Sequence, residues 1–296
     1  ALVISDHHTD WLECHPAAGK SAEDTRRALD KFKGTDKIIE LYSDNAPELI
    51  KAAADMKIRH ETSTPYRSAT NSIAERNIKR VLEGTRTILE QSGFGTKWWP
   101  AASKHFCTSL NITLTDGDSP YNRRLGDGHF PGLKLPFGCT IDFKPLHPKM
   151  VADLPKFGKR SMPKIFLGYH MRSGGRWSGD YLVAPMADFS KVNDTGIIRM
   201  CRIKEVVKVR GESFSFPLRE VRDRRQRGVD VGTEADRVEV ELADGQTETL
   251  ALLGDWSEDI EIAEVLEDIP DAPPPDVEMH FDSTGHRIRK RYKNSA

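Results

Sequence analysis

Two stretches of this sequence decide its fold: Ser43-Asp44-Asn45, and Thr64-Pro65-Tyr66-Arg67-Ser68-Ala69-Thr70-Asn71-Ser72-Ile73-Ala74-Glu75-Arg76. The apolar run 38–42 before Asp44 predicts a strand, and the apolar spacing of residues 78–89 predicts a helix that opens near Ser72. Asp44 therefore ends a strand, and Glu75 lies in the first turn of a helix. Two carboxylates in such positions can hold a divalent metal ion for phosphodiester chemistry.

Each carboxylate also has a simpler interpretation. An aspartate after a strand and shortly before Pro47 is typical of a turn residue or a helix N-cap. Glu75 precedes Lys79 by four residues, which favours a surface ion pair along the helix. The neighbouring residues shift the balance toward nucleic acid, because basic and hydrogen-bonding side chains surround Glu75. We expect nucleic-acid contacts from Tyr66, Arg67, Asn71, Arg76, Lys79, Arg80 and Arg86.

The composition limits the possible classes of protein. Of 296 residues, 38% are hydrophobic and 30% are charged, so we expect part of the chain to lack a hydrophobic core. The net charge of −1 argues against nucleic-acid binding through overall charge, although charge is strongly segregated along the chain. The four cysteines have neither zinc-ligand spacing nor the pattern of a disulfide framework, which fits a reducing intracellular compartment. The sequence has no apolar run long enough for a signal peptide or a membrane span.

The residue pattern divides the chain into three regions. Residues 1–126 alternate predicted strands and helices, which indicates an α/β domain. Residues 127–211 carry short strands punctuated by proline and glycine, which indicates a small antiparallel β module. Residues 212–296 are expected to form a mostly disordered, charged tail that ends in the basic cluster 286–293. That cluster is either a nuclear-import or nucleic-acid patch, or simply the solvated end of a tail.

The motifs of the first region resemble the integrase catalytic core of retroelement Pol polyproteins, most closely the copia type. The resemblance is carried by Ser43-Asp44-Asn45 and by the pattern from Pro65-Tyr66 through Asn71 and Ile73-Ala74-Glu75-Arg76-Asn77. It extends over residues 1 to about 190. It is strong between residues 41 and 111, which include Trp98-Trp99-Pro100 and Asn111. It is weaker after residue 119, where the matches are Ser119-Pro120-Tyr121, Pro136-Phe137-Gly138-Cys139 and Ile165-Phe166-Leu167-Gly168-Tyr169.

The resemblance implies a fold and an activity. The fold would be an RNase H-like integrase core, a mixed sheet with flanking helices. Asp44 and Glu75 would be the second and third members of an Asp-Asp-Glu triad that binds Mg²⁺ or Mn²⁺. The reaction would be polynucleotidyl transfer, with cleavage of 3′ ends and strand transfer. Implied partners are element-end DNA, target DNA and other integrase subunits, and the implied location is the nucleus.

The chain departs from the family pattern at its start. It begins within a predicted strand and without an initiator methionine, and the family's first catalytic aspartate would lie upstream of residue 1. Asp6 is the only substitute, and a turn or strand-end role is favoured for it. Thirty residues separate Asp44 from Glu75, fewer than the family pattern has. We therefore expect a fragment with little or no activity.

Other functions stay open on the sequence alone. One is a non-catalytic nucleic-acid-binding remnant of a decayed element, and another is an RNase H-like nuclease that degrades its substrate. Zinc binding by His7, His8, His15 and Cys14 is not expected, because adjacent residues on a strand point to opposite faces. Trp98 and Trp99 are expected to pack in the core.

Overall fold

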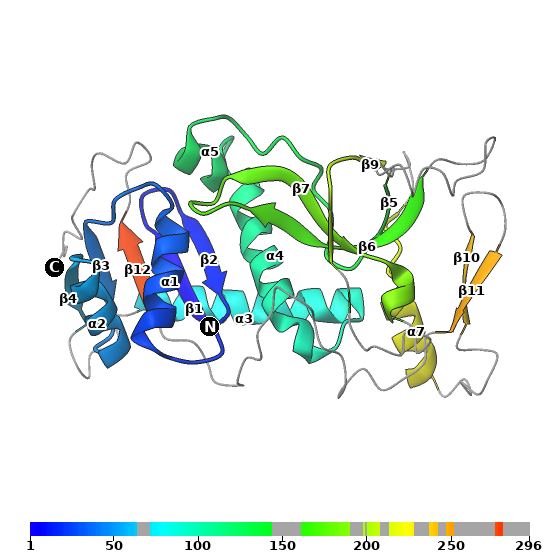
Figure 1. Cartoon of the computed structure of the whole chain (residues 1–296), viewed down its shortest axis with the longest axis horizontal. Helices are drawn as coiled ribbons and strands as arrows, with labels where there is room; N and C mark the ends of the chain where they lie inside the picture. The colour runs from blue at the N-terminus through cyan, green and yellow to red at the C-terminus, as the bar shows by residue number, and fades with distance from the viewer. Residues whose placement is uncertain are drawn as a thin grey trace.

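The computed structural model describes residues 1–63, 72–143, 161–189, 198, 200–207, 213–227, 237–241, 247–251 and 276–280. These residues form a mixed α/β domain and an antiparallel β module, as the sequence predicts (Figure 1). The helices are α1 (Ala22–Lys33), α2 (Pro47–Asp55), α3 (Ser72–Ser92), α4 (Trp99–Ile112), α5 (Pro120–Leu125) and α7 (Pro217–Gln226). The strands are β1 (Leu2–Asp6), β2 (Trp11–His15), β3 (Glu40–Ser43), β4 (Arg59–Thr62), β5 (Thr140–Phe143), β6 (Met162–Met171), β7 (Trp177–Ala184), β8 (Cys201–Ile203), β9 (Val206–Val207), β10 (Arg237–Glu241), β11 (Thr247–Ala251) and β12 (Asp276–His280). Two 3₁₀ turns, Thr96–Trp98 and Met186–Phe189, complete them.

The first sheet has the order β2-β1-β12-β3-β4. Strand β1 pairs antiparallel with β2, and β3 pairs parallel with β4. Between these two pairs lies β12, from near the end of the chain, which runs parallel to β1 and antiparallel to β3. All five residues of β1 are buried, as expected of a strand covered on both faces.

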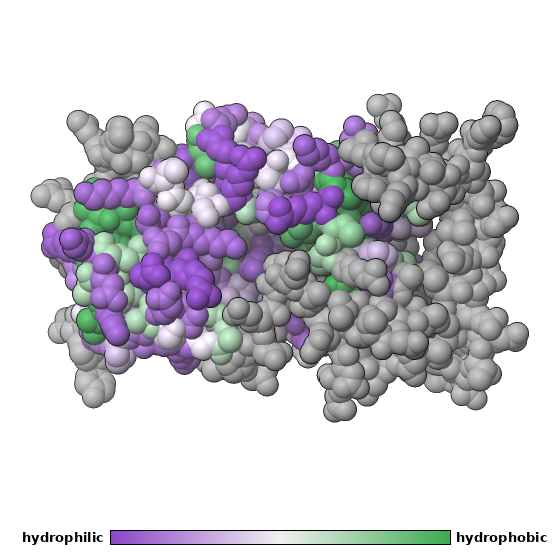
Figure 2. All heavy atoms as spheres, viewed as in Figure 1, coloured by the Kyte–Doolittle hydropathy of each residue, from purple (hydrophilic) through white to green (hydrophobic). Residues whose placement is uncertain are grey.

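Local sequence features explain where two helices of this domain begin. The hydroxyl of Ser21 accepts a hydrogen bond from the Asp24 backbone N–H and caps α1, and Pro47 occupies the first turn of α2. Helix α1 buries Leu29 and Phe32 against the sheet and turns its charged side toward solvent. The resulting hydrophilic surface over α1 is visible in Figure 2. These packed helices give the sheet the flanking layer expected of an integrase-like core.

The second sheet, in the order β8-β7-β6-β5-β9, is antiparallel throughout. Strands β6 and β7 form a long hairpin whose turn contains Gly174 and Gly175, both with positive φ. This is the small antiparallel β module expected for the second region, and a pair of adjacent glycines is typical of such a hairpin turn.

The module and the α/β domain share one hydrophobic core. A single cluster of buried residues includes Ile4 and Trp11 from the first sheet and Phe166 and Tyr181 from the second. The tip of the β6–β7 hairpin reaches α1, where the Gly174 N–H donates to the Lys31 carbonyl at 2.8 Å. The two sheets are therefore held together by apolar packing and by the hairpin tip.

The region beyond residue 212 contains more order than the sequence suggests. Helix α7 packs Leu218 and Val221 into a second buried cluster with Trp98 and Phe94. The basic run of residues 219–227 was expected to belong to the disordered tail. It lies mostly on helix α7, whose Leu218 and Val221 are buried. The basic cluster 286–293 lies outside the described residues.

Several smaller expectations can be compared with the structure. Trp98 is buried at 1% exposure, in agreement with a core role. All four cysteines are free thiols, and Cys14, Cys107 and Cys139 are buried. Within the described ranges, no helix is long and apolar enough to cross a membrane.

Candidate metal and nucleic-acid site

Asp44 follows directly after β3, where the strand turns toward α2. Its Oδ1 accepts a hydrogen bond from the Ala46 backbone N–H at 3.2 Å, so one carboxylate oxygen stabilises the turn. The other oxygen has no hydrogen-bond or ion-pair partner among the described residues. Because the N-cap of α2 is Ala46, the interpretation of Asp44 as the N-cap residue is wrong. One carboxylate oxygen of Asp44 therefore stabilises the turn, and the other is available to a ligand.

His60 lies beside this turn on the neighbouring strand. Its Nε2 is 2.7 Å from the hydroxyl of the buried Ser43. Partial burial lowers the pKa of His60, and the nearby negative charge of Asp44 opposes that shift. No local sequence pattern indicates this contact, because it depends on the parallel pairing of β3 with β4.

Glu75 is an exposed side chain in the first turn of α3. The expected ion pair between Glu75 and Lys79 does not form. Lys79 instead lies 3.8 Å from Glu83, one turn further along. Among the described residues Glu75 has no ion-pair partner, so its carboxylate is available to a ligand.

The start of α3 is attached to β1, two strands away from β3 in the first sheet. The Asn77 side chain donates to the Ser5 hydroxyl on β1 at 3.1 Å. Ser5 pairs with Glu278, which pairs with Tyr42 on β3, so Ser5 and Tyr42 are separated by two interstrand spacings, about 10 Å. Glu75 precedes Asn77 by two residues on α3, and Asp44 follows Tyr42 by two residues after β3. Asn77 is thus the residue that positions the start of α3 on the sheet.

The predicted nucleic-acid contacts divide into two groups. Arg76, Lys79, Arg80 and Arg86 are all exposed on α3, away from the buried stripe that contains Val81. With 3.6 residues per turn, Lys79 and Arg86 continue the line of Glu75 along the helix. The other predicted contacts, Tyr66, Arg67 and Asn71, lie outside the described residues.

Asp6 has a structural role in this fold. It is fully buried, and its carboxylate accepts hydrogen bonds from the His8 backbone N–H at 2.9 Å and the Thr9 hydroxyl at 2.7 Å. The Arg124 guanidinium, also buried, lies 3.6 Å from Asp6 Oδ2. A carboxylate already engaged by an ion pair and by turn hydrogen bonds matches the strand-end role favoured from the sequence.

The donor set suits a hard cation. Asp44 and Glu75 offer carboxylate oxygens, the ligands preferred by Mg²⁺ and Mn²⁺. In the described part of the chain, no group of three or more His, Cys, Asp or Glu side chains is arranged to hold a metal ion. Mg²⁺, however, commonly binds through one or two carboxylates together with water and substrate phosphates. Two carboxylates beside a basic helix fit that mode of binding.

Comparison with known proteins supports the resemblance seen in the motifs. The chain is 25% identical over 181 residues to the retrovirus-related Pol polyprotein from transposon RE1 of Arabidopsis thaliana, and 26% identical to that from transposon RE2. Each match covers 57% of this chain and 12% of the relative, so the chain spans a small part of those polyproteins. No family model matches the sequence. The relationship to retroelement Pol polyproteins that the motifs predict is thereby confirmed.

Solved structures give weaker similarities. The catalytic core domain of BIV integrase is 17% identical, with a TM-score of 0.32, and the match covers 41% of this chain and 91% of that one. A simian T-cell lymphotropic virus intasome in complex with the PP2A regulatory subunit B56 gamma gives 14% identity and a TM-score of 0.35 over 70% of this chain and 72% of that one.

Proposed function

We propose that this chain, a relative of retrotransposon Pol polyproteins, acts in DNA integration as part of a metal-dependent polynucleotidyl transferase. The observation that carries the proposal is the pair of available carboxylates, Asp44 after β3 and Glu75 in α3, beside exposed arginines and lysines in a sequence similar to Pol polyproteins. Element-end and target DNA are the proposed nucleic acids, with other copies of the chain as partners and the nucleus as the place of action.

Each group has a defined part in this proposal. Mg²⁺ or Mn²⁺, when bound by Asp44 and Glu75, would activate a nucleophile and stabilise the leaving oxygen of a phosphodiester. Arg76, Lys79, Arg80 and Arg86 would bind the phosphate backbone and fix the position of the scissile bond. Asn77 would hold the start of α3 against β1, and so keep Glu75 at the level of Asp44.

The test compares carboxylate variants with matched controls. Asp44→Asn and Glu75→Gln remove the proposed ligands, whereas Asp55→Asn and Glu83→Gln remove exposed carboxylates elsewhere on α2 and α3. We expect Mn²⁺ to strengthen binding of duplex DNA ends to the unmodified chain and to both controls, and not to Asp44→Asn or Glu75→Gln. Since little or no activity is expected of this fragment, metal-dependent DNA binding is the main readout, and any joined product from labelled duplex ends with Mn²⁺ or Mg²⁺ should follow the same pattern.

The products distinguish the alternatives. Released oligonucleotides without joined products would favour a degrading nuclease. DNA binding that falls steeply with salt but is indifferent to Mn²⁺ would favour a non-catalytic binding protein. If Glu75→Gln behaves like Glu83→Gln in every assay, the proposed metal site is wrong.

A further inference from the structure

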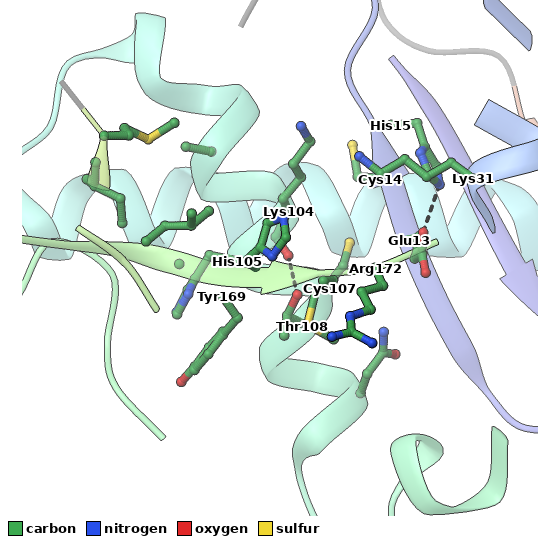
Figure 3. Close-up of a pocket in the computed structure, with 18 of the residues that line it drawn as sticks. Glu13, Cys14, His15, Lys31, Lys104, His105, Cys107, Thr108, Tyr169 and Arg172 are labelled. Carbon is green, nitrogen blue, oxygen red and sulfur yellow. Dashed lines mark hydrogen bonds and ion pairs between the residues drawn. The ribbon is translucent and has the colours of Figure 1, made fainter. Parts of the chain in front are cut away.

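A cavity of about 570 Å³ lies between the two sheets, away from Asp44 and Glu75. Its wall comes from β2, α1 and α4 on one side and from β6, β7 and the residues around β8 on the other. Figure 3 shows side chains from α1, β2 and α4 converging on it. The volume falls within the range of pockets that hold small molecules.

The charge of this cavity is strongly positive. Four cationic side chains line it: Lys31, Lys104, Arg172 and Arg202. Glu13 is the one carboxylate among the lining residues. No ion pair among the described residues involves any of the four cations, so their charges are not balanced by the protein as described.

Glu13 offsets only part of this charge, because a single carboxylate, which acts on Lys104, faces four cations. Oε1 accepts a hydrogen bond from the Trp11 indole N–H at 2.7 Å, and Oε2 lies 2.9 Å from His15 Nε2 (Figure 3). These contacts keep the pKa of Glu13 below its ordinary value in spite of the opposing effect of burial.

The cations are also close enough to affect one another. Burial and the neighbouring charge of Lys31 together lower the pKa of Lys104 to about 8, whereas Cys14 and Glu13 oppose that shift. Burial also lowers the pKa of His170 on β6, and the charges of Arg202, Lys31 and Arg172 add to that shift, whereas Asp180 opposes it. Four cations that gather around one cavity and outnumber its single carboxylate favour the binding of anions.

The cavity wall also contains a neutral histidine with one buried nitrogen that lacks a hydrogen-bond partner. His105 lines the cavity from α4 at 4% exposure, and its Nδ1 has no hydrogen-bond partner. Its Nε2 lies 3.2 Å from the Ser109 hydroxyl, which leaves Nδ1 as the free position. A buried nitrogen without a partner is costly unless a ligand or water reaches it.

We propose that this cavity binds a small polyanion with several phosphate groups, of the inorganic or organic polyphosphate class. Lys104 and Lys31 would contact it from the α/β domain, and Arg172 and Arg202 from the β module, so the ligand would join the two sheets. A cavity of about 570 Å³ matches a compact polyphosphate better than a nucleic-acid duplex, which needs a larger surface. This ligand site is separate from the proposed metal site.

Tripolyphosphate is the probe for the test, measured by isothermal titration calorimetry at constant ionic strength. We expect Lys104→Met and the paired change Arg172→Gln with Arg202→Gln each to weaken binding by about tenfold to a hundredfold. Arg172 and Arg202 are exposed, so their variant should fold even if Lys104→Met does not. Lys51→Met, at an exposed lysine of α2 outside the cavity, is the matched control and should bind as the unmodified chain does.

Three results would overturn the proposal. One is tripolyphosphate affinity no greater than that of sulfate at equal ionic strength. Another is an equal effect of Lys51→Met and of the two pocket variants. The third is oligonucleotide binding that the pocket variants weaken while tripolyphosphate fails to bind, which would make the cavity wall part of a nucleic-acid surface.

Discussion

Arg124 is the most buried cation of the described structure, at 2% exposure. Its guanidinium donates to the Phe32 carbonyl at 2.7 Å and to the Gly174 carbonyl at 3.2 Å, and it lies 4.5 Å from the centre of the Phe32 ring. With Asp6 it forms a buried ion pair that links α5, β1 and the tip of the β6–β7 hairpin. One side chain therefore connects three elements that are far apart in sequence.

Replacing Arg124 by methionine should remove these contacts and leave the Asp6 carboxylate buried without its counter-charge. We expect the free energy of unfolding to fall by about 3–5 kcal/mol, the usual effect of removing one partner of a buried ion pair. Urea denaturation followed by circular dichroism measures this change. Arg123→Met removes partly exposed ion pairs with Asp10 and Asp118 and should change stability by about 1 kcal/mol or less. Equal losses for the two variants would contradict the role given to Arg124.

The burial of His105 should make the stability of the folded chain sensitive to acid. Burial among aromatic rings lowers its pKa to about 3, so the folded chain keeps His105 neutral while the unfolded chain protonates it near its ordinary value of 6.5. The stabilisation is therefore complete above pH 6.5 and is lost progressively as the pH falls toward 3. Between pH 6.5 and pH 5 this one group should cost about 2 kcal/mol. His105→Phe should lose less stability over that interval in urea titrations, and an unchanged pH dependence would refute the assignment.

At the scale of elements, α3 and α4 approach each other closely at one glycine. A Cβ on Gly84 would lie 2.1 Å from the ring of Phe106 on α4. Glycine in a helix interior ordinarily costs about 1 kcal/mol relative to alanine. Here that cost is offset by the packing of the Phe106 ring against the helix backbone.

Gly84→Ala should therefore destabilise the chain, against the usual helix preference. We expect a loss of about 1–3 kcal/mol, because Phe106 must move out of its contact. In a Phe106→Ala background the same change should be neutral or stabilising by about 1 kcal/mol. Thermal unfolding of the four proteins in this cycle measures the coupling, and additive effects would exclude the contact.

Elements defined by local pattern were predictable from the sequence, and those defined by distant pairing were not. Ser21 and Pro47 are residue types typical of the starts of helices such as α1 and α2. The glycine pair 174–175 is typical of a hairpin turn such as that between β6 and β7. Nothing near residues 276–280 indicates that β12 lies between β1 and β3, because that pairing is set by partners more than two hundred residues away. At the candidate site the two carboxylates were visible in the sequence. The salt bridge of Lys79 with Glu83 was not, since both turns of the helix offer an acidic neighbour at the same spacing.

At the scale of the molecule, the hairpin tip fastens the β module to the α/β domain. Gly175, at φ 87°, lies so close to Trp11 on β2 that an added Cβ would be 2.3 Å from the indole ring. The shared core around Trp11 and Tyr181 continues the same contact inward. The two sheets should therefore unfold together.

Gly175→Ala tests this coupling. It should lower the free energy of unfolding by about 2 kcal/mol or more, through backbone strain and the clash with Trp11. Gly179→Ala meets the same positive φ, 89°, but no atom within 4 Å, so it isolates the strain alone. Tryptophan fluorescence and far-ultraviolet circular dichroism should give coincident transitions in every variant. Two separated transitions would show that the sheets are independent.

The buried cysteines make the opening of this molecule directly observable. Burial raises the pKa of Cys14, Cys107 and Cys139, so in the native state few of these sulfurs are thiolates and few are reachable by a reagent. Their alkylation rate then reports how often the surrounding structure opens, without any introduced label. Cys14 and Cys107 also line the cavity between the sheets, so a ligand in the cavity should slow their alkylation. Cys139 does not line it, so its alkylation rate is the internal control.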